Sequence, residues 1–192
     1  SMWWHGTQVE NYALSIVFLN ACLWLVARAG PDRRCPPLVF FLAGLALLNH
    51  AQNGALTLAA GALALADRPW RTAEGRRWLS RCAAAWAIGA APYVAVLVAD
   101  IVRAGELRPA LQDALGGGFQ SLMFRYGWSS VVSLGAWLVQ QFPSPFLLFV
   151  PLGAIALARS RARRPAAIFV AVVLAVNTAF FLGYETWDQF AF

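Results

Sequence analysis

The stretch LLNHAQNGAL, residues 47–56, places Asn49, His50, Gln52 and Asn53 inside a long apolar region. Polar groups inside a bilayer are unfavourable unless they form hydrogen bonds within the protein or take part in its function. The apolar runs on either side, residues 36–48 and 54–66, are shorter than the about 20 residues that a membrane-crossing helix needs. We predict that they form a helical hairpin whose polar tip lies below the membrane surface, in a water-filled or protein-lined cavity. The alternative is one long, tilted or kinked helix that carries a polar patch.

The composition of the whole chain is that of a membrane protein. Its 192 residues are 60% hydrophobic and only 12% charged, whereas a soluble globular chain is about 45–50% apolar and about 25% charged. Apolar blocks also cover residues 11–27, 82–102, 146–158 and 165–183. We therefore predict an all-α polytopic membrane protein, with about six membrane-crossing helices of which two are short and form the hairpin.

Residues 107–141 do not fit a simple membrane span. Residues 107–126 are mixed in character and contain three consecutive glycines, which match no phosphate-binding loop or dinucleotide fingerprint. Residues 127–141 are amphipathic and carry Trp128 and Trp137, so we expect a helix that lies along the membrane interface. We treat residues 1–192 as a single transmembrane domain. The polar, aromatic start and the end soon after an apolar run suggest an internal fragment of a longer protein.

The basic residues predict the orientation in the membrane. The net charge is +6, and every basic residue is an arginine. Because the arginines cluster in short loops between apolar runs, topology explains them better than binding to nucleic acid. By the positive-inside rule, three loops with clustered arginines face the cytoplasm. The first loop has Arg28, Arg33 and Arg34; the second has Arg68, Arg71, Arg76, Arg77 and Arg81; the third has Arg159, Arg161, Arg163 and Arg164. Both histidines and most of the acidic residues then fall on the opposite face, where an externally facing active site is expected.

The candidate site residues on that face each allow two interpretations. His50 is a candidate general base, hydrogen-bond donor to a phosphate, or structural bridge, and Asn49, Gln52 and Asn53 beside it suit either binding or helix capping. Glu10, near the first apolar run, is a site residue or a favourable charge at a helix N-terminus. His5 belongs to the same outer face.

Two further groups lie later in the chain. Arg125 has no acidic neighbour in sequence, so it is a candidate clamp for a lipid-linked phosphate or a contact to lipid headgroups. Tyr184, Glu185 and Asp188 follow the last apolar run and suit binding of sugar hydroxyls or a cation, or an ordinary interfacial loop.

Other types of site are disfavoured by the residues present. Cys22, Cys35 and Cys82 have no zinc-ligand spacing, and we expect reduced thiols. Neither a Ser/His/Asp set nor an HExxH motif is recognisable. We assign no metal-binding residues and no certain cofactor, and the need for a divalent metal stays open.

Several segments together resemble a known family. The chain shows WWHGTQVENYAL before a span, FLAGLALLNHAQNGALTLAAGALAL after a basic loop, APYVAVLVAD, and YETWDQFAF. In this order they resemble a bacterial family of membrane proteins related to protein O-mannosyltransferases, within the GT-C glycosyltransferase superfamily. The matching positions are Val9, Glu10, Asn11 and Tyr12, then Gly44, Leu45, Asn49 and His50, then Pro92 and Tyr93, with Glu185 in place of an aspartate in the last motif.

The resemblance implies a reaction and a cellular location. Such enzymes transfer a sugar from a polyprenyl-phosphate carrier to a hydroxyl of an acceptor protein, glycan or lipid, on the periplasmic or exterior side of the bacterial inner membrane. The implied partners are membrane lipid, the lipid-linked sugar and the acceptor, with no nucleic acid. The acidic residue that acts as general base in the family lies in a loop expected upstream of Ser1, so the catalytic residue is unknown here.

Two other functions compete with this one. In a transporter or flippase subunit, the short helices around residues 49–53 would form a binding site near the bilayer midplane. A non-catalytic assembly protein would tolerate substitution of the polar residues at the helix tips.

Overall fold

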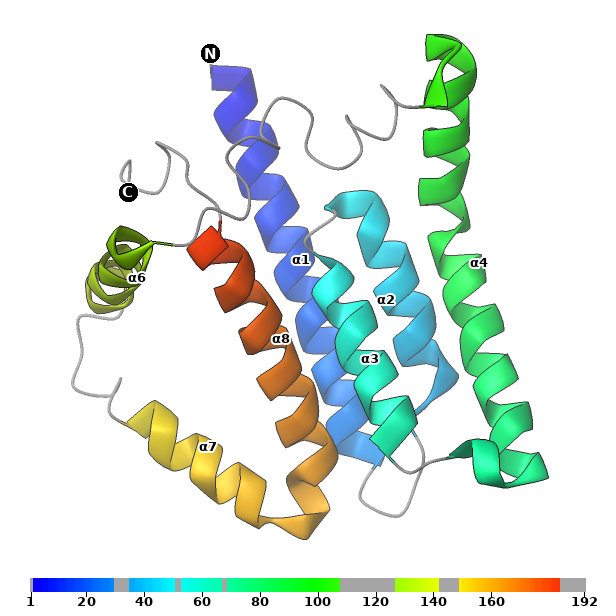
Figure 1. Cartoon of the computed structure of the whole chain (residues 1–192), viewed down its shortest axis with the longest axis vertical. Coiled ribbons are helices and arrows are strands. Elements are labelled where there is room, and N and C mark those ends of the chain that lie inside the picture. Colours follow the sequence, from blue (N-terminus) through cyan, green and yellow to red (C-terminus); the bar gives the residue numbers. More distant parts are fainter. Residues whose placement is uncertain are drawn as a thin grey trace.

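The computed structural model describes residues 2–29, 35–50, 53–66, 69–107, 127–141 and 149–183. The described part is helical, with no strand, which confirms the all-α prediction. Its helices are α1 (Met2–Ala29), α2 (Pro37–Asn49), α3 (Gly54–Ala66), α4 (Ala73–Ala104), α6 (Trp128–Gln141), α7 (Phe149–Arg159) and α8 (Arg164–Gly183), with 3-10 turns η2 (Pro69–Arg71) and η5 (Arg161–Arg163). Figure 1 shows α1, α2, α3, α4 and α8 side by side, with α6 and α7 at one flank.

Helices α2 and α3 form the predicted hairpin. Each has 13 residues, and the chain reverses direction between them (Figure 1). Helix α2 starts directly after Pro36, with proline again in its first turn, where the missing N–H leaves no bond unmade. It ends at His50, whose backbone is extended and whose N–H donates to the Ala46 carbonyl oxygen at 3.3 Å. The alternative of one continuous kinked helix is therefore wrong.

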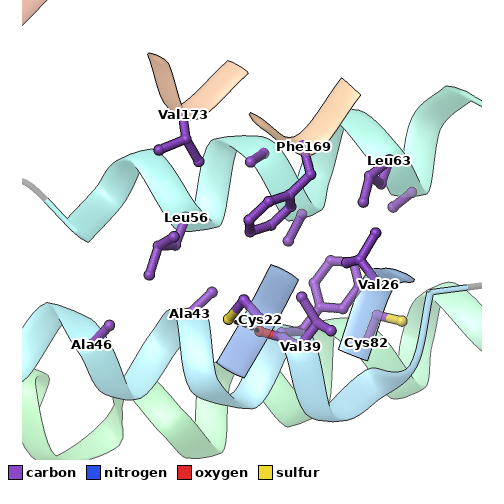
Figure 2. Packing of buried hydrophobic residues seen from close by; sticks show 14 of the residues in the cluster. Cys22, Val26, Val39, Ala43, Ala46, Leu56, Leu63, Cys82, Phe169 and Val173 are labelled. Carbon is purple, nitrogen blue, oxygen red and sulfur yellow. Dashed lines mark hydrogen bonds between the residues drawn. The ribbon is translucent and has the colours of Figure 1, made fainter. Parts of the chain in front are cut away.

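The core of the bundle lies between the hairpin, α1, α8 and the first half of α4. Figure 2 shows Phe169 of α8 directed between Leu56 and Leu63 of α3, with Val39 of α2 below. Phe169 and Val39 are fully buried, as are Cys22 of α1 and, nearly so, Cys82 of α4. Many remaining core positions are alanine. Small side chains let the helix backbones come close, as is usual for helices packed in a membrane.

The closest helix contact joins α2 to α4 through one glycine from each. A Cβ atom added to Gly44 would overlap the Trp86 carbonyl oxygen and lie 2.9 Å from the Ala90 nitrogen. A Cβ atom added to Gly89 would overlap the Phe41 carbonyl oxygen. The two backbones thus touch directly, which only residues without a side chain permit.

Helix α4 is longer than the sequence predicted. It begins at Ala73 rather than near residue 82, because the Thr72 side chain caps it by accepting a hydrogen bond from the Gly75 N–H at 3.0 Å. It continues through Pro92 and ends at Gly105, whose φ of 71° is the left-handed conformation that glycine adopts easily at a helix end.

The number of helices able to cross a membrane differs from the prediction. Within the described residues, one helix, Ala73–Arg103, is long and apolar enough to cross by length and composition. The apolar helices Ala13–Ala29, Pro37–Asn49, Gly54–Ala66 and Arg164–Phe180 are shorter. Helix α7, expected to span over residues 146–158, has only 11 residues. Of the about six predicted membrane-crossing helices, the described residues therefore support one, α4, by length and composition. The other crossings stay predictions.

Candidate functional site

The two ends of the bundle differ in chemistry. In Figure 1, the C-terminus of α1, the start of α4 and the turn between α7 and α8 all lie at the lower end. We call this lower end of the bundle the arginine end. Its segments carry Arg28, Arg71, Arg76, Arg77, Arg81, Arg159, Arg163 and Arg164. The hairpin tip, with Asn49, His50 and Asn53, lies toward the opposite end (Figure 1). The separation that the sequence predicted between arginine loops and this tip is thus present.

Asn49 and Asn53 at the hairpin tip form hydrogen bonds with a third helix, α1. The Asn49 side-chain nitrogen donates to the Ser15 hydroxyl of α1 at 2.8 Å, and the Asn53 side-chain nitrogen donates to the same oxygen at 3.1 Å. Asn53 also donates to the Ala46 carbonyl oxygen at 3.0 Å and is only 8% exposed. We call this arrangement the Ser15 clasp. It fixes the hairpin tip to α1, which is a packing role for Asn49 and Asn53; the binding role predicted for them stays a prediction.

A second polar contact joins three helices deeper in the bundle. The Trp86 indole of α4 donates to the Thr57 hydroxyl of α3 at 3.1 Å. That hydroxyl donates to the Ala43 carbonyl oxygen of α2 at 3.5 Å. Together with the Ser15 clasp, this chain of hydrogen bonds ties α1, α2, α3 and α4 together.

His50 differs from its asparagine neighbours because it lies on the surface. The residue is exposed, and its carbonyl oxygen accepts from the Asn53 N–H at 2.9 Å across the turn. Desolvation by the surrounding chain lowers the pKa of the imidazole below its usual value of 6.5. This desolvation favours the neutral form of the ring, in which one nitrogen is a donor and the other an acceptor. A neutral imidazole suits proton transfer or hydrogen bonding to a phosphate or hydroxyl.

The structure corrects the explanation of Glu10 as a helix cap. Helix α1 begins at Met2, so Glu10 lies in the third turn rather than at the start of the helix. A carboxylate gains from the helix dipole only near the first turn. The capping interpretation is therefore wrong, and the site interpretation stays a prediction. His5 lies in the same N-terminal part of α1, which rises past the hairpin tip in Figure 1.

The remaining predicted site residues are not placed. Gln52, Arg125, Tyr184, Glu185 and Asp188 lie outside the described residues. Near the C-terminus of α4, Arg103 forms an exposed ion pair with Asp100 at 3.2 Å. Among the described residues, no group of three His, Cys, Asp or Glu side chains is placed to hold a metal ion.

Sequence reasoning missed Ser15 as the partner of the polar tip and Thr57 as the partner of Trp86. Thr57 is the one hydroxyl of α3, and Ser15 lies in the apolar part of α1; a hydroxyl in such apolar surroundings was the available signal. Their partners could not be read from the sequence, because Ser15 is 34 and 38 positions away from the two asparagines that it binds.

No family model, curated protein or solved structure matches this chain. The fold and the site together define a structural class of protein. It is an apolar helical bundle with a basic end and with an exposed histidine at a hairpin tip toward the other end. The assignment of a function therefore depends on the geometry and on the sequence motifs.

Proposed function

We propose that this chain is part of a membrane glycosyltransferase of GT-C type. It binds a polyprenyl-phosphate sugar near the hairpin tip, on the face opposite the arginine end, and the sugar passes to an acceptor hydroxyl there. The observation that carries the proposal is the position of His50. It is an exposed imidazole at the turn between two short helices, on the side of the bundle away from the arginines.

The lengths of the helices support a recessed position for this tip. At about 1.5 Å per residue, the 13 residues of α2 extend about 20 Å, less than the about 30 Å of a bilayer core. Helices α1 and α4 have 28 and 32 residues and rise past the tip in Figure 1. If α4 crosses the membrane with the arginine end at one surface, the tip lies below the other surface. A lipid-linked phosphate enters such a site from the bilayer.

The proposed role of His50 is to donate one hydrogen bond to the donor substrate. Its N–H donates to an oxygen of the phosphate that leaves the anomeric carbon, which stabilises the charge that develops there. The rigid Ser15 clasp beside it holds the tip in one position, which favours a preorganised contact. The general base that removes the acceptor proton is not assigned to a described residue.

Binding of the donor tests the proposal. The protein, purified in detergent, is titrated with a short-chain polyprenyl-phosphate mannose, and its intrinsic tryptophan fluorescence is followed. We expect His50→Ala to weaken binding about tenfold, as for the loss of one hydrogen bond to a charged group, and His50→Gln to retain part of the affinity. The melting temperatures of these variants should stay close to that of the unmodified protein, because the residue is exposed.

A matched control is Asn20→Ala, which removes another exposed polar side chain, on α1. It should change neither binding nor the melting temperature. Undiminished binding by His50→Ala would overturn the assignment of His50 to the donor site.

A transporter is the second candidate, and the observation that favours it is the helix break at the tip. The two functions differ in outcome. A transporter moves the lipid-linked sugar between leaflets of proteoliposomes with the sugar still attached, whereas a transferase releases polyprenyl phosphate when the acceptor is present.

A further inference from the structure

The start of α4 presents arginines on one side and packs on the other. Gly75 and Cys82 are buried, and Trp78 and Leu79 contact the core, with the Trp78 ring edge-on to Phe40 at 6.2 Å between centroids. The opposite side carries the exposed residues Arg76, Arg77 and Arg81, and Arg71 of η2 is exposed just before it. This segment is therefore fixed by its apolar side while its guanidinium groups face outward.

Among the described residues, the acidic side chain at this end is Glu74 in the first turn of α4, so arginines outnumber carboxylates there. The turn between α7 and α8 adds exposed Arg159, Arg163 and Arg164, and α1 ends with exposed Arg28. The ion pair that the structure gives within its described residues is that of Arg103 with Asp100, near the far end of α4. A charge surplus gathered from three separate segments repels itself unless anions neutralise it.

Two tryptophans border the arginines. Trp24 of α1 is 57% exposed, with the Arg28 guanidinium over its ring at 5.0 Å from the centroid. Trp70 of η2 is 45% exposed, and its carbonyl oxygen accepts from Arg76 at 3.1 Å. Exposed tryptophan next to arginine is the pattern found at the level of lipid headgroups, where the ring meets the acyl chains and the charge meets phosphate.

We propose that the arginine end is a binding surface for the headgroups of anionic phospholipids. A flat array of phosphates matches guanidinium groups spread over α1, α4 and the α7–α8 turn. A single free phosphate would need groups that converge on one point. Nucleic acid fits less well, because the exposed side chains that continue from this end along the bundle, such as Trp24, Leu65 and Ile88, are apolar. The inference does not depend on sugar transfer.

The experiment compares two lipid environments. The protein is reconstituted into nanodiscs of pure phosphatidylcholine, or of phosphatidylcholine with roughly 30% phosphatidylglycerol, and its melting temperature is measured. We expect the anionic lipid to raise the melting temperature by about 5 °C, because a ligand that binds the folded state stabilises it. Raising the salt concentration to about 1 M should remove most of this increase, since charge interactions are then screened.

Arginine variants distinguish lipid binding at the arginine end from a general effect of the protein's positive charge. The triple variant Arg71→Gln, Arg77→Gln, Arg81→Gln should lose most of the increase, and the double variant Arg163→Gln, Arg164→Gln should lose part of it. Arg103→Gln removes an arginine at the other end and should keep the full increase. The proposal is overturned if Arg103→Gln and the triple variant behave alike, if inorganic phosphate or duplex DNA gives the same increase in pure phosphatidylcholine, or if phosphatidylglycerol has no effect. If the triple variant does not fold, the double variant and the salt dependence decide the question.

Discussion

The two halves of α4 differ both in composition and in surroundings, since residues 73–90 include Glu74, Arg76, Arg77 and Arg81 and residues 91–103 are almost entirely apolar. In residues 73–90, Gly75, Cys82, Gly89 and Ala90 are buried, and the backbone touches α2 at Gly89. In residues 91–103 no residue is buried, and the partly buried ones, Tyr93, Leu97 and Ile101, continue the same helix face. The valines at positions 94, 96, 98 and 102 are 50%, 52%, 51% and 75% exposed.

The difference shows that apolar sequence has two uses in this helix. In the first half, close contact with α2 supplies stability through packing, and the partly buried Trp86 indole donates a hydrogen bond to Thr57 of α3. In the second half, the apolar side chains cover the helix without contributing much to the core. Such exposure is unfavourable in water and expected in lipid. Substitutions in the two halves should therefore act on different properties.

The largest expected effect is in the core on which the first half of α4 packs. Phe169→Ala should lower the free energy of unfolding by about 4 kcal/mol, because it removes a fully buried ring and leaves a cavity. Val102→Ala, in the exposed half, should change it by less than about 0.5 kcal/mol. Unfolding of both variants by denaturant in detergent measures the difference, and similar losses would mean that Val102 is packed as closely as the core residue Phe169 of α8.

The next effect is at the glycine contact between α2 and α4. Gly89→Ala and Gly44→Ala should each lower the free energy of unfolding by about 3 kcal/mol, since the added methyl group meets backbone that cannot move aside. Gly61→Ala, in α3, is the control, because no atom lies within 4 Å of its added Cβ. That variant should be neutral or slightly stabilising, as alanine favours helix over glycine by about 1 kcal/mol. If Gly89→Ala were as stable as Gly61→Ala, the contact would be looser than described.

A smaller effect is expected at the Ser15 clasp. Asn53→Ala should lower the free energy of unfolding by about 1–2 kcal/mol, because it removes two hydrogen bonds and leaves the Ala46 carbonyl oxygen with one partner fewer. Ser15→Ala combined with Asn53→Ala should be less destabilising than the sum of the single variants, since they share a bond. Additive effects in this double-mutant cycle would exclude a direct interaction.

The smallest effect on stability is expected in the exposed half of α4. Val94→Ser with Val98→Ser should change the free energy of unfolding in detergent by less than about 0.5 kcal/mol per site. The same variant should be recovered less fully in the membrane fraction of expressing cells, because serine enters a bilayer less readily than valine. Equal recovery in the membrane would indicate that this half faces water or another protein.

The sequence by itself determined which segments are helical, though not where α1 and α4 begin, and the distribution of charge. Residues 54–66 form α3 as predicted, and the hairpin and the arginine end follow from run lengths and loop composition. These features depend on local composition and on neighbours within a few positions, so they can be read from the chain directly. The position of His50 at an exposed turn follows from the same local pattern.

Only the tertiary structure decided how the polar residues and glycines are used. Two asparagines beside His50 donate to Ser15, Gly44 meets Gly89 through bare backbone, and Glu10 lies inside a helix rather than at its start. The hydrogen bonds to Ser15 and the glycine contact depend on which helices pack together and at what distance. That choice is made by many weak contacts between residues far apart in the chain, and no local pattern encodes it.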